Sequence, residues 1–531
     1  MTLRGFFTAA PHDDGSPVTG HYYENASNDP DRAQAWGYTD ALTYRPGDTL
    51  RLHLNARGPS LHLSIVRDGL NPATVIDTTV ACGFSPTPSD CSVTGCGWPV
   101  GFSLAIPADW PSGLYRITLR VEGHASEHMF VLRPALDGPR AGILMMLATG
   151  TWAAYNDWGG SNHYQGLTGA DGRDFSPNVS LLRPWARGFV SWPSDAPRIP
   201  HASALLTKPR YPHMEYARAN GVSKKYASSG WAAFERPFAL WCEAQDIALD
   251  FTTQHELHRD PATLEGYDRV VIVGHDEYWT WQMRDHLDAW VDRGGRLCRF
   301  AGNFFWQTRL SADLVTQTCF KSRAEAEDPA MTGDRSRLTS YWDHPLIGRP
   351  ATLSLGLTGS AGVYAGWSRC AAHGAGGFAI YRPDHWALRG TGLGYGDVLG
   401  AKAKIFGYEV DGIDYTMTHG LPYPADDAAL AGHLEIVGLS PATTLSHSTG
   451  PDDADDFIGN ADAEHLAATV LGDPSAGGIG RVARGNGMMA EYRRGSGAIF
   501  NAGSCEWVAG LIAHDAAVEH VTRTLLTGEW G

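Results

Sequence analysis

The first 140 residues contain short runs in which apolar and polar positions alternate. Residues 44–55 and 112–121 each begin with a glycine-containing turn and continue as an alternating run. Strict alternation places one face of a strand in a core and the other in water, as in antiparallel sheets. We therefore predict an all-β domain over residues 1–140, with about seven short strands in an immunoglobulin-like sandwich.

From about residue 141 the apolar residues form continuous runs, which are typical of strands buried on both faces. Residues 269–274 form the clearest run, and a helical pattern over 280–291 separates it from a second run at 296–301. A strand, a helix and a strand with short links form a βαβ unit. We predict that residues 141–531 form an α/β domain with a doubly wound parallel sheet. Residues 340–495 are interpreted as a β-rich insertion or as a second sheet packed on the first.

Other segments of the same region predict further elements. Residues 236–245 predict a helix with proline in its first turn, residues 247–251 and 497–501 predict strands, and residues 511–526 predict a helix. His255-Glu-Leu-His258 lacks the spacing of the H-E-x-x-H metalloprotease motif, and it is interpreted as a solvated turn.

The charge balance excludes some classes of partner. The 531-residue chain has a formal net charge of −16, and an acidic surface repels nucleic acid. No apolar run approaches the roughly 20 residues that cross a bilayer, and the N-terminus lacks the apolar stretch of a secretory signal. We expect a cytoplasmic protein without a membrane partner. Its eight cysteines are expected as free thiols, although one disulfide among Cys82, Cys91 and Cys96 stays open.

Polar groups embedded in aromatic residues follow three of the predicted strands. These segments are Thr149–Gly160, Gly274–Trp279 and Gly302–Trp306. Ligands of open parallel sheets bind beyond the carboxyl ends of the strands. We therefore expect the three segments to meet at one pocket.

Five polar residues of this region are candidates for chemistry. His275, Asp276 and Glu277 are consecutive, and an extended chain points His275 and Glu277 to the same side. That arrangement suits a metal site or an acid–base pair, and the alternative is a cap on the following helix. Asn303 could donate to an oxyanion or form an Asx turn. Glu409 follows an apolar stretch and could be a buried base with a raised pKa, although the residues alone favour a carboxylate in water at a strand edge.

The absence of other motifs narrows the chemistry. The sequence has no G-x-S-x-G, no P-loop, no dinucleotide fingerprint and no C-x-x-C. A nucleophile-elbow hydrolase, a kinase, a nicotinamide enzyme and a cysteine zinc site are therefore disfavoured.

Several short motifs occur together in one order along the chain. They are Gly37-Tyr-Thr-Asp40, Trp110-Pro-Ser-Gly-Leu-Tyr115, Ala154-Tyr-Asn-Asp-Trp-Gly-Gly160, Gly274-His-Asp-Glu-Tyr-Trp279, Phe300-Ala-Gly-Asn303, Gly407-Tyr-Glu-Val-Asp-Gly412 and Asn501-Ala-Gly-Ser-Cys-Glu-Trp507. In this combination the chain resembles the large (beta) subunit family of N,N-dimethylformamidase. The resemblance spans most of the chain.

The resemblance implies a glutamine-amidotransferase-like α/β domain and an amidohydrolase. Such an enzyme cleaves a small N-substituted amide, such as N,N-dimethylformamide, to an amine and a carboxylate by metal-activated water. The family holds a mononuclear iron, Fe(III), on two tyrosines and a glutamate, and motif position makes Tyr155 and Glu277 two of these metal ligands. His275, Asn303 and Glu409 match the family's catalytic surroundings, with Glu409 taking the water proton. Anionic oxygen donors suit Fe(III), which acts as a Lewis acid on the formyl oxygen.

The second tyrosine is expected in Leu181-Leu-Arg-Pro-Trp185, where the sequence has Trp185. An indole N–H is a donor only and cannot ligate a metal. Tyr164, Tyr211 and Tyr216 remain as alternatives, although none has the matching spacing. The resemblance further implies a homo-oligomer with a possible small accessory subunit.

Two other functions fit the residues. One is a metal-free amide or ester hydrolase that uses His275 with Glu277 or Glu409 as acid and base. The other is a non-catalytic protein that binds a small ligand or carbohydrate in an aromatic pocket, since the chain has 18 Trp.

Overall fold

The computed structural model describes residues 7–9, 22–168, 174–198, 212–363, 376–425, 430, 432–443, 467–468, 472–482 and 484–531. The chain divides into two compact units. Unit 1 comprises Met1–Arg198, His213–Thr263 and Arg309–Cys319, and unit 2 comprises Ile199–Pro212, Leu264–Thr308 and Phe320–Gly531. The protein is multidomain and β-rich, and the predicted boundary near residue 140 stays a prediction.

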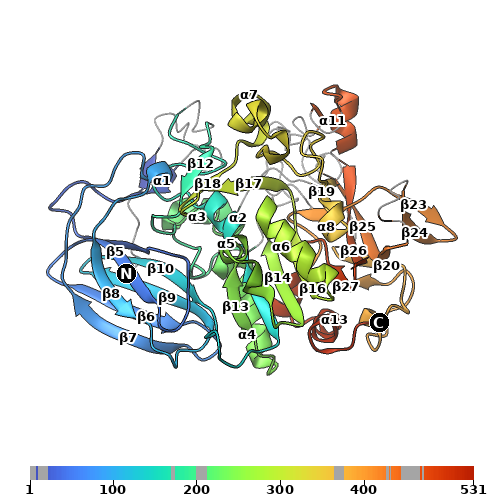
Figure 1. Cartoon of the computed structure of the whole chain (residues 1–531), viewed down its shortest axis with the longest axis horizontal. Coiled ribbons are helices and arrows are strands. Elements are labelled where there is room, and N and C mark those ends of the chain that lie inside the picture. The colour runs from blue at the N-terminus through green and yellow to red at the C-terminus, as the bar shows by residue number, and fades with distance from the viewer. Residues whose placement is uncertain are drawn as a thin grey trace. The chain divides into compact units, whose positions relative to one another are not determined.

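Antiparallel strands dominate the N-terminal part of unit 1 (Figure 1). A three-stranded sheet has the order β3 (Gln34–Thr39), β5 (Thr49–Arg57) and β8 (Val100–Ala105) in the described residues. A five-stranded sheet there has the order β4 (Thr43–Tyr44), β10 (His124–Leu132), β9 (Gly113–Val121), β6 (Leu61–Arg67) and β7 (Ala73–Val80). Leu52 of β5 and Leu119 of β9 lie in one buried cluster, so the two sheets share a core. The alternation predicted for residues 44–55 and 112–121 is confirmed, and the immunoglobulin-like arrangement stays a prediction.

Two buried histidines of β10 connect the two sheets. The backbone N–H of Ala35 donates to His124 Nδ1, and that of Thr39 donates to His128 Nε2, each over 3.1 Å. Each ring accepts a hydrogen bond from a backbone N–H of β3, so the accepting nitrogen carries no proton and the imidazole is neutral. Burial lowers the pKa of each histidine to about 3.

The remainder of unit 1 mixes helices with short strands. They are β1 (Phe7–Ala9), β2 (Tyr22–Glu24), α1 (Cys91–Thr94), β11 (Ile143–Leu147), α2 (Thr149–Tyr155), β12 (Asn178–Ser180), α3 (Pro212–Asn220), a π-helix η2 (Trp231–Glu235), α4 (Arg236–Ala244), β13 (Asp250–Thr253), α5 (Gln254–Arg259) and β18 (Thr316–Thr318). β11 pairs in parallel with β13, as expected for strands buried on both faces. The predicted solvated turn at His255 is wrong, because the Thr253 side chain caps α5 and buries its first turn.

The described cysteines are free thiols, as expected. Cys82, Cys91 and Cys96 form no disulfide, so that alternative is wrong. Cys242, Cys298, Cys319 and Cys505 are also free, and Cys370 lies outside the described residues.

A mixed sheet forms the centre of unit 2. Its strand order is β14 (Arg269–His275), β16 (Arg296–Gly302), β27 (Gly497–Asn501), β26 (Arg484–Arg494), β25 (Leu434–Thr443), β20 (Phe378–Ile380) and β21 (Val398–Leu399). The first three strands are parallel, and α6 (Trp281–Asp292) connects β14 to β16, which confirms the predicted βαβ unit. The sheet is antiparallel from β26 onward, so the predicted parallel arrangement holds only for these first three strands. Because only two residues separate β26 from β27, the two strands form a hairpin.

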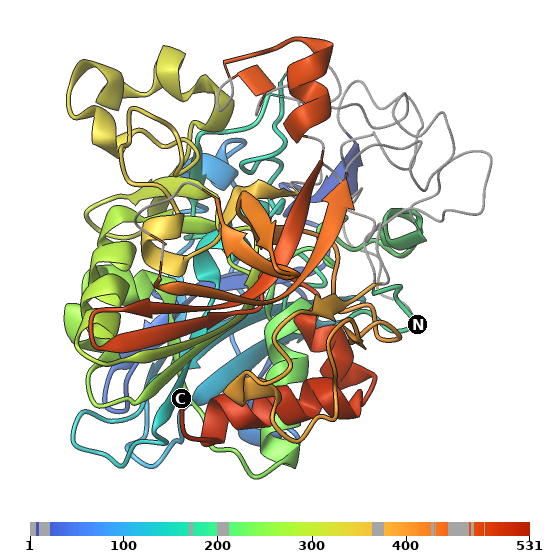
Figure 2. The ribbon, with the colours of Figure 1, turned by 90° about the vertical axis from the view of Figure 1, so that its right-hand side faces the viewer.

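Helices cover both faces of this sheet. Figure 2 shows α6 on one side of the sheet and α12 (Trp507–Ile512) with α13 (Ala516–Thr527) on the other. The single helix predicted over 511–526 is two helices, because the Asp515 side chain caps a new start at α13. α6 and α13 have 12 residues each, and no helix of the described residues is long and apolar enough to cross a membrane.

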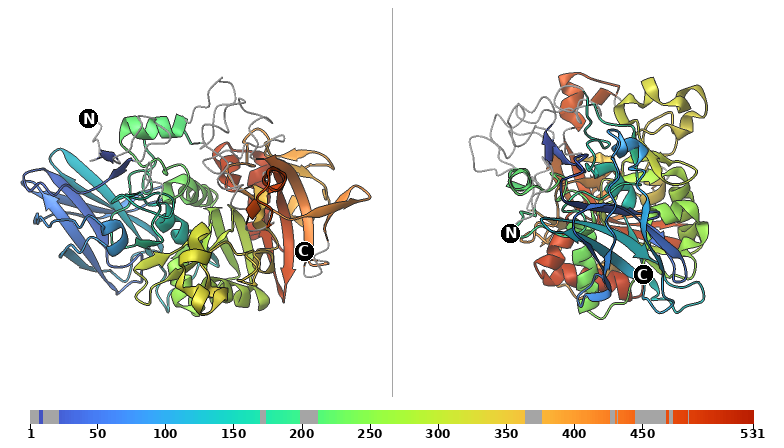
Figure 3. Two further views of the ribbon diagram at one scale, coloured as in Figure 1. Left: turned by 90° about the horizontal axis from the view of Figure 1, so that it is seen from above. Right: turned by 90° about the vertical axis from the view of Figure 1, so that its left-hand side faces the viewer.

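The predicted β-rich character of residues 340–495 is confirmed, and four of its strands extend the central sheet. The other elements of unit 2 include β15 (Tyr278–Thr280), β17 (Trp306–Leu310, which continues into unit 1), β19 (Thr358–Val363), β22 (Val410–Gly412), β23 (Tyr415–Thr418), β24 (Leu421–Pro424), α7 (Ala324–Glu327), α8 (Thr352–Leu355) and α11 (Ala476–Val482). Short helical turns lie at η3 (Pro261–Leu264), η4 (Lys321–Arg323), η5 (Pro329–Thr332), η6 (Arg335–Arg337) and η8 (Trp386–Leu388). The β23–β24 hairpin projects from the rest of unit 2 in Figure 3.

Candidate active site

The carboxyl ends of β14 and β16 bring two predicted site residues together. His275 ends β14, and it lies opposite Gly302, the last residue of β16, in the parallel register. Asn303 follows with a φ of 62°, in the left-handed region that asparagine tolerates better than most residues. The chain therefore turns sharply at the strand end and keeps the Asn303 side chain beside His275.

Glu409 reaches the same place from a distant part of the chain. It lies between Tyr408, with a φ of 59°, and the start of β22. A Cβ at Gly302 would lie 2.5 Å from the Glu409 carbonyl oxygen and 2.7 Å from the Cys505 nitrogen. Only glycine at residue 302 lets the segments around Glu409 and Cys505 pack this closely against β16.

Short polar contacts join the four site residues of unit 2. His275 Nε2 lies 2.6 Å from Glu409 Oε2 and 3.3 Å from Glu277 Oε2. Asn303 Nδ2 donates to Glu409 Oε2 over 2.7 Å and lies 3.3 Å from His275 Nε2. Trp306 Nε1 donates to Glu277 Oε1 over 2.7 Å. All five side chains are buried, so these contacts are shielded from water.

Burial dominates the electrostatics of Glu409. Desolvation raises the pKa of this carboxyl, and the nearby Glu277 carboxylate raises it further. His275 and the hydrogen bond from Asn303 oppose these effects. Glu409 is thus a buried carboxyl with a hydrogen-bonded imidazole beside it, a combination that can accept and return a proton.

Three structural alternatives for these residues are wrong. The cap of α6 is the side chain of Thr280, whose Oγ1 accepts from the Met283 N–H over 3.2 Å, so His275 and Glu277 do not cap the helix. Asn303 forms no Asx turn in the described part of the chain, since its Oδ1 has no hydrogen-bond partner there. Glu409 is buried, which also corrects the expectation of a carboxylate in water.

Cys505 is a further member of the site that the sequence analysis missed. His275, Glu409 and Cys505 are all buried, and their ligand atoms lie within 4.8 Å of one another, so this group could hold a metal ion. Burial, with Glu409 and Asp411 nearby, raises the pKa of the Cys505 thiol well above its usual value. The sequence could have indicated Cys505 as a site residue, because Cys505 follows the end of β27, a strand parallel to β16.

Tyr155 lies in unit 1, at the last position of α2. Its ring centroid is 4.4 Å from that of Tyr164, and the Lys225 ammonium lies 5.1 and 4.5 Å from the two rings. Tyr164, one of the alternatives for the second tyrosine, is therefore next to Tyr155. The approach of Tyr155 to Glu277 stays a prediction.

The other residues considered as second ligands have other surroundings. Trp185 is buried and packs against Trp152 and Phe189, with ring centroids 6.2 Å from each. Tyr216 donates its hydroxyl to the Ser194 carbonyl oxygen. Tyr211 lies outside the described residues.

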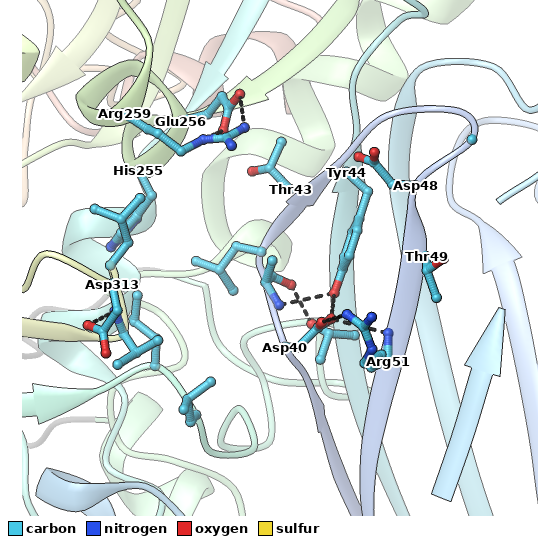
Figure 4. A pocket seen from close by; sticks show the side chains of 18 residues that line it. Asp40, Thr43, Tyr44, Asp48, Thr49, Arg51, His255, Glu256, Arg259 and Asp313 are labelled. Carbon is cyan, nitrogen blue, oxygen red and sulfur yellow. Dashed lines mark hydrogen bonds and ion pairs between the residues drawn. The ribbon is translucent and has the colours of Figure 1, made fainter. Parts of the chain in front are cut away.

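A separate cavity of about 610 Å³ lies within unit 1 (Figure 4). The Asp40 carboxylate pairs there with Arg51 over 3.1 Å and accepts from the Tyr44 hydroxyl over 2.5 Å. Across the cavity, Glu256 pairs with Arg259 over 2.7 Å. Because the Asp40 and Glu256 carboxylates already have partners, the lining of this cavity does not indicate a particular ligand.

Comparisons with known proteins show which family the chain resembles. The family model described as N,N-dimethylformamidase beta subunit-like, C-terminal, matches residues 72–519. No curated protein matches the chain. Among solved structures, the crystal structure of a DUF4784 family protein from Bacteroides caccae is 13% identical over 21% of this chain and 24% of that chain, with a TM-score of 0.11. That likeness is too slight to inform the fold.

Proposed function

Because the chain belongs to the N,N-dimethylformamidase beta subunit-like family, we propose that it hydrolyses a small N-substituted amide to an amine and a carboxylate. N,N-dimethylformamide is the representative substrate. The observation that carries the proposal is the buried cluster in which Glu409 Oε2 contacts both His275 Nε2 and Asn303 Nδ2, over 2.6 and 2.7 Å. A carboxyl with a raised pKa, an imidazole and an amide donor are the groups that amide hydrolysis needs.

Glu409 is the proposed general base. It takes a proton from water as the water oxygen attacks the amide carbonyl carbon, and it then returns that proton to the nitrogen of the departing amine. The raised pKa of Glu409 favours both steps, because a carboxyl of ordinary pKa holds the proton too weakly to carry it forward.

Asn303 is the proposed partner of the substrate oxygen, and His275 is the proposed partner of Glu409. Asn303 Nδ2 now donates to Glu409, and the same N–H₂ group has a second hydrogen for a developing oxyanion. His275 orients Glu409 through their 2.6 Å contact. The left-handed backbone at Asn303 fixes where the amide points.

The donor set of the site fits a cation. Glu277 and Glu409 are two buried carboxylates that flank one imidazole, and Glu277 raises the pKa of Glu409 through their repulsion. A positive ion relieves that repulsion. We propose Fe(III) held by Tyr155 and Glu277, with Tyr164 beside Tyr155 as the second tyrosine. When bound, the ion supplies Lewis-acid polarisation of the amide carbonyl.

The test combines metal analysis with amine release. The full-length protein is purified from cells grown with iron, and its iron content, visible spectrum and turnover of a formamide panel are measured. The proposal expects about one iron per chain, a tyrosinate-to-iron absorption band and amine release. Turnover that persists without metal would instead support the metal-free hydrolase, for which the His275–Glu409 contact already provides an acid–base pair. Protein that binds small amides or sugars without turnover would support the non-catalytic alternative.

A further inference from the structure

Arg299 is a fully buried guanidinium in the middle of β16. Its Nε donates to Asp276 Oδ2 over 2.8 Å, and its Nη2 also binds the Asp276 carboxylate. Its Nη1 donates to Asp411 Oδ2 over 2.5 Å and to Asn501 Oδ1 over 3.0 Å. In the described part of the chain, Arg299 forms no hydrogen bond or ion pair with the side chains of the four proposed site residues of unit 2.

Each partner of Arg299 belongs to a different segment of the site. Asp276 lies between His275 and Glu277 in the chain. Its carboxylate binds Arg299, whereas the side chains of His275 and Glu277 are part of the proposed site. Asp411 follows Glu409 by two residues. Asn501 ends β27, and its Oδ1 also accepts from the Gly503 N–H over 3.0 Å, in the loop that leads to Cys505.

Asp411 extends this network to the fourth segment. Its Oδ1 accepts from the backbone N–H of Asn303 over 2.8 Å and from that of Phe304 over 3.2 Å. These bonds hold the turn in which Asn303 adopts its left-handed backbone. One guanidinium thus connects the chain segments that carry all the proposed unit 2 residues.

The geometry of Arg299 suits a residue that holds several chain segments together. A guanidinium is planar and presents its donors in a fixed fork, so it sets the angle between two carboxylates as well as their distance. Both carboxylates and the guanidinium are buried, and removing one partner leaves an uncompensated buried charge. Lysine provides the same charge without the fork.

We propose that Arg299 is a positioning residue, which holds the segments of the site in register through Asp276 and Asp411. The inference rests on the proposed function. Arg299 sets the distance between the proton acceptor Glu409 and its partner His275, and it does not take part in the bond changes. The rate of the chemical step therefore depends on its fork geometry.

The test compares Arg299→Lys with a matched control, Arg133→Lys. Arg133 is also a buried guanidinium paired with a buried carboxylate, Glu256, but it lies in unit 1 and contacts no proposed site residue. Amide hydrolysis by each full-length variant is measured as kcat and KM, together with Tm. We expect R299K to lower kcat about 100-fold with KM changed less than about threefold, because small displacements of reacting groups have effects of this size. R133K should leave kcat and KM within about twofold at a similar loss of Tm. Equal effects of the two variants on kcat would overturn the proposal.

Crystal structures of the variants separate this inference from the proposed function. In R299K we expect His275 Nε2 and Glu409 Oε2 to move out of hydrogen-bond contact from their present 2.6 Å. An unchanged site in R299K contradicts the positioning role even if turnover falls. If the wild-type protein hydrolyses no amide, the proposed function fails, and the displacement still decides the role of Arg299. Should R299K fail to fold, D411N and D276N provide the same two readouts.

Discussion

Two residues of the proposed site have a strained backbone. Asn303 and Tyr408 both have positive φ values, of 62° and 59°. Asn303 donates a hydrogen bond to Glu409, and Tyr408 directly precedes Glu409 in the chain. A bulky residue such as tyrosine rarely adopts this region, at a cost of about 1–3 kcal/mol. The Asp411 carboxylate and the glycine at 302 hold the strained segments in place. Such strain is retained where it presents side chains for chemistry.

Two replacements of Asn303 separate its side chain from its backbone. Asn303→Gly should lower kcat about 100-fold, because it removes the amide donor while glycine adopts a φ of 62° freely. Asn303→Ala removes the same donor and should also lower the unfolding free energy by about 1 kcal/mol relative to Asn303→Gly. Steady-state kinetics and denaturant unfolding measure the two effects. An N303G variant with wild-type kcat would show that the amide has no part in the reaction.

The acid limb of the pH–rate profile reports the state of Glu409. Since the base must be deprotonated, kcat/KM should fall as the pH drops through the Glu409 pKa, which burial raises above the usual 4.5. The hydrogen bond from Asn303 lowers this pKa, so the limb should move to higher pH in N303G. A limb at or below pH 4.5, or a shift to lower pH in N303G, contradicts Glu409 as the base.

At the scale of elements, periodicity predicted the regular parts of the fold. The βαβ unit of β14, α6 and β16 follows from one apolar run, one helical pattern and another apolar run, and each lies within a residue or two of its prediction. The antiparallel half of the sheet was not predicted, because strand direction depends on connections rather than on the pattern within a strand. The segment at His255 was predicted as a turn because it is too short to show a helical pattern. The structure shows that the Thr253 side chain caps a short helix there.

The proximity of two candidate site residues follows from the strand ends that precede them. His275 and Asn303 follow β14 and β16, and the parallel pairing of these strands brings the two residues together. The residues alone made Glu409 a candidate, but its association with Asn303 required the family resemblance, since more than 100 residues separate the two and no local pattern links them. Arg299 was missed because its role depends on tertiary contacts that a short motif does not encode, whereas Cys505 was overlooked although it follows a predicted strand end.

The histidines that join β3 and β10 make the fold sensitive to acid. His124 and His128 have a folded-state pKa of about 3, as does His255 in α5, whereas an unfolded histidine titrates near 6.5. Between these values the unfolded chain binds more protons, so stability is present above pH 6.5 and is lost as the pH falls toward 3. Glu24 has the opposite effect on stability: burial raises its pKa to about 7, so its contribution is lost as the pH rises through this value.

Replacing one of these histidines tests the effect. His128→Gln should reduce the pH dependence of the unfolding free energy by about 1.4 kcal/mol per pH unit between pH 4 and 6. The Gln side chain oxygen can still accept from the Thr39 N–H. Denaturant titrations at several pH values measure this slope for both proteins. An identical slope in H128Q would mean that His128 is not held neutral in the fold.

At the scale of the whole molecule, the iron proposal depends on Tyr155 and Glu277, two residues that are far apart in the sequence. Tyr155→Phe removes the phenol oxygen and retains the ring that packs against Tyr164. We expect Y155F to lose most of its iron and its tyrosinate-to-iron absorption, as measured by elemental analysis and visible spectroscopy. Trp185→Phe is a matched aromatic control that should keep both, and full iron content in Y155F rules out Tyr155 as a ligand.

Amine release from N,N-dimethylformamide, measured for the wild-type protein and Glu409→Gln in one assay, tests the central claim most directly. We expect the wild-type protein to release dimethylamine and E409Q to do so at least about 100-fold more slowly, because glutamine fills the same space but accepts no proton from water. E409Q should keep a Tm at or above that of the wild type, since it removes a buried carboxyl. Equal rates of amine release from the two proteins would contradict the assignment of Glu409 and, with it, the proposed reaction centre.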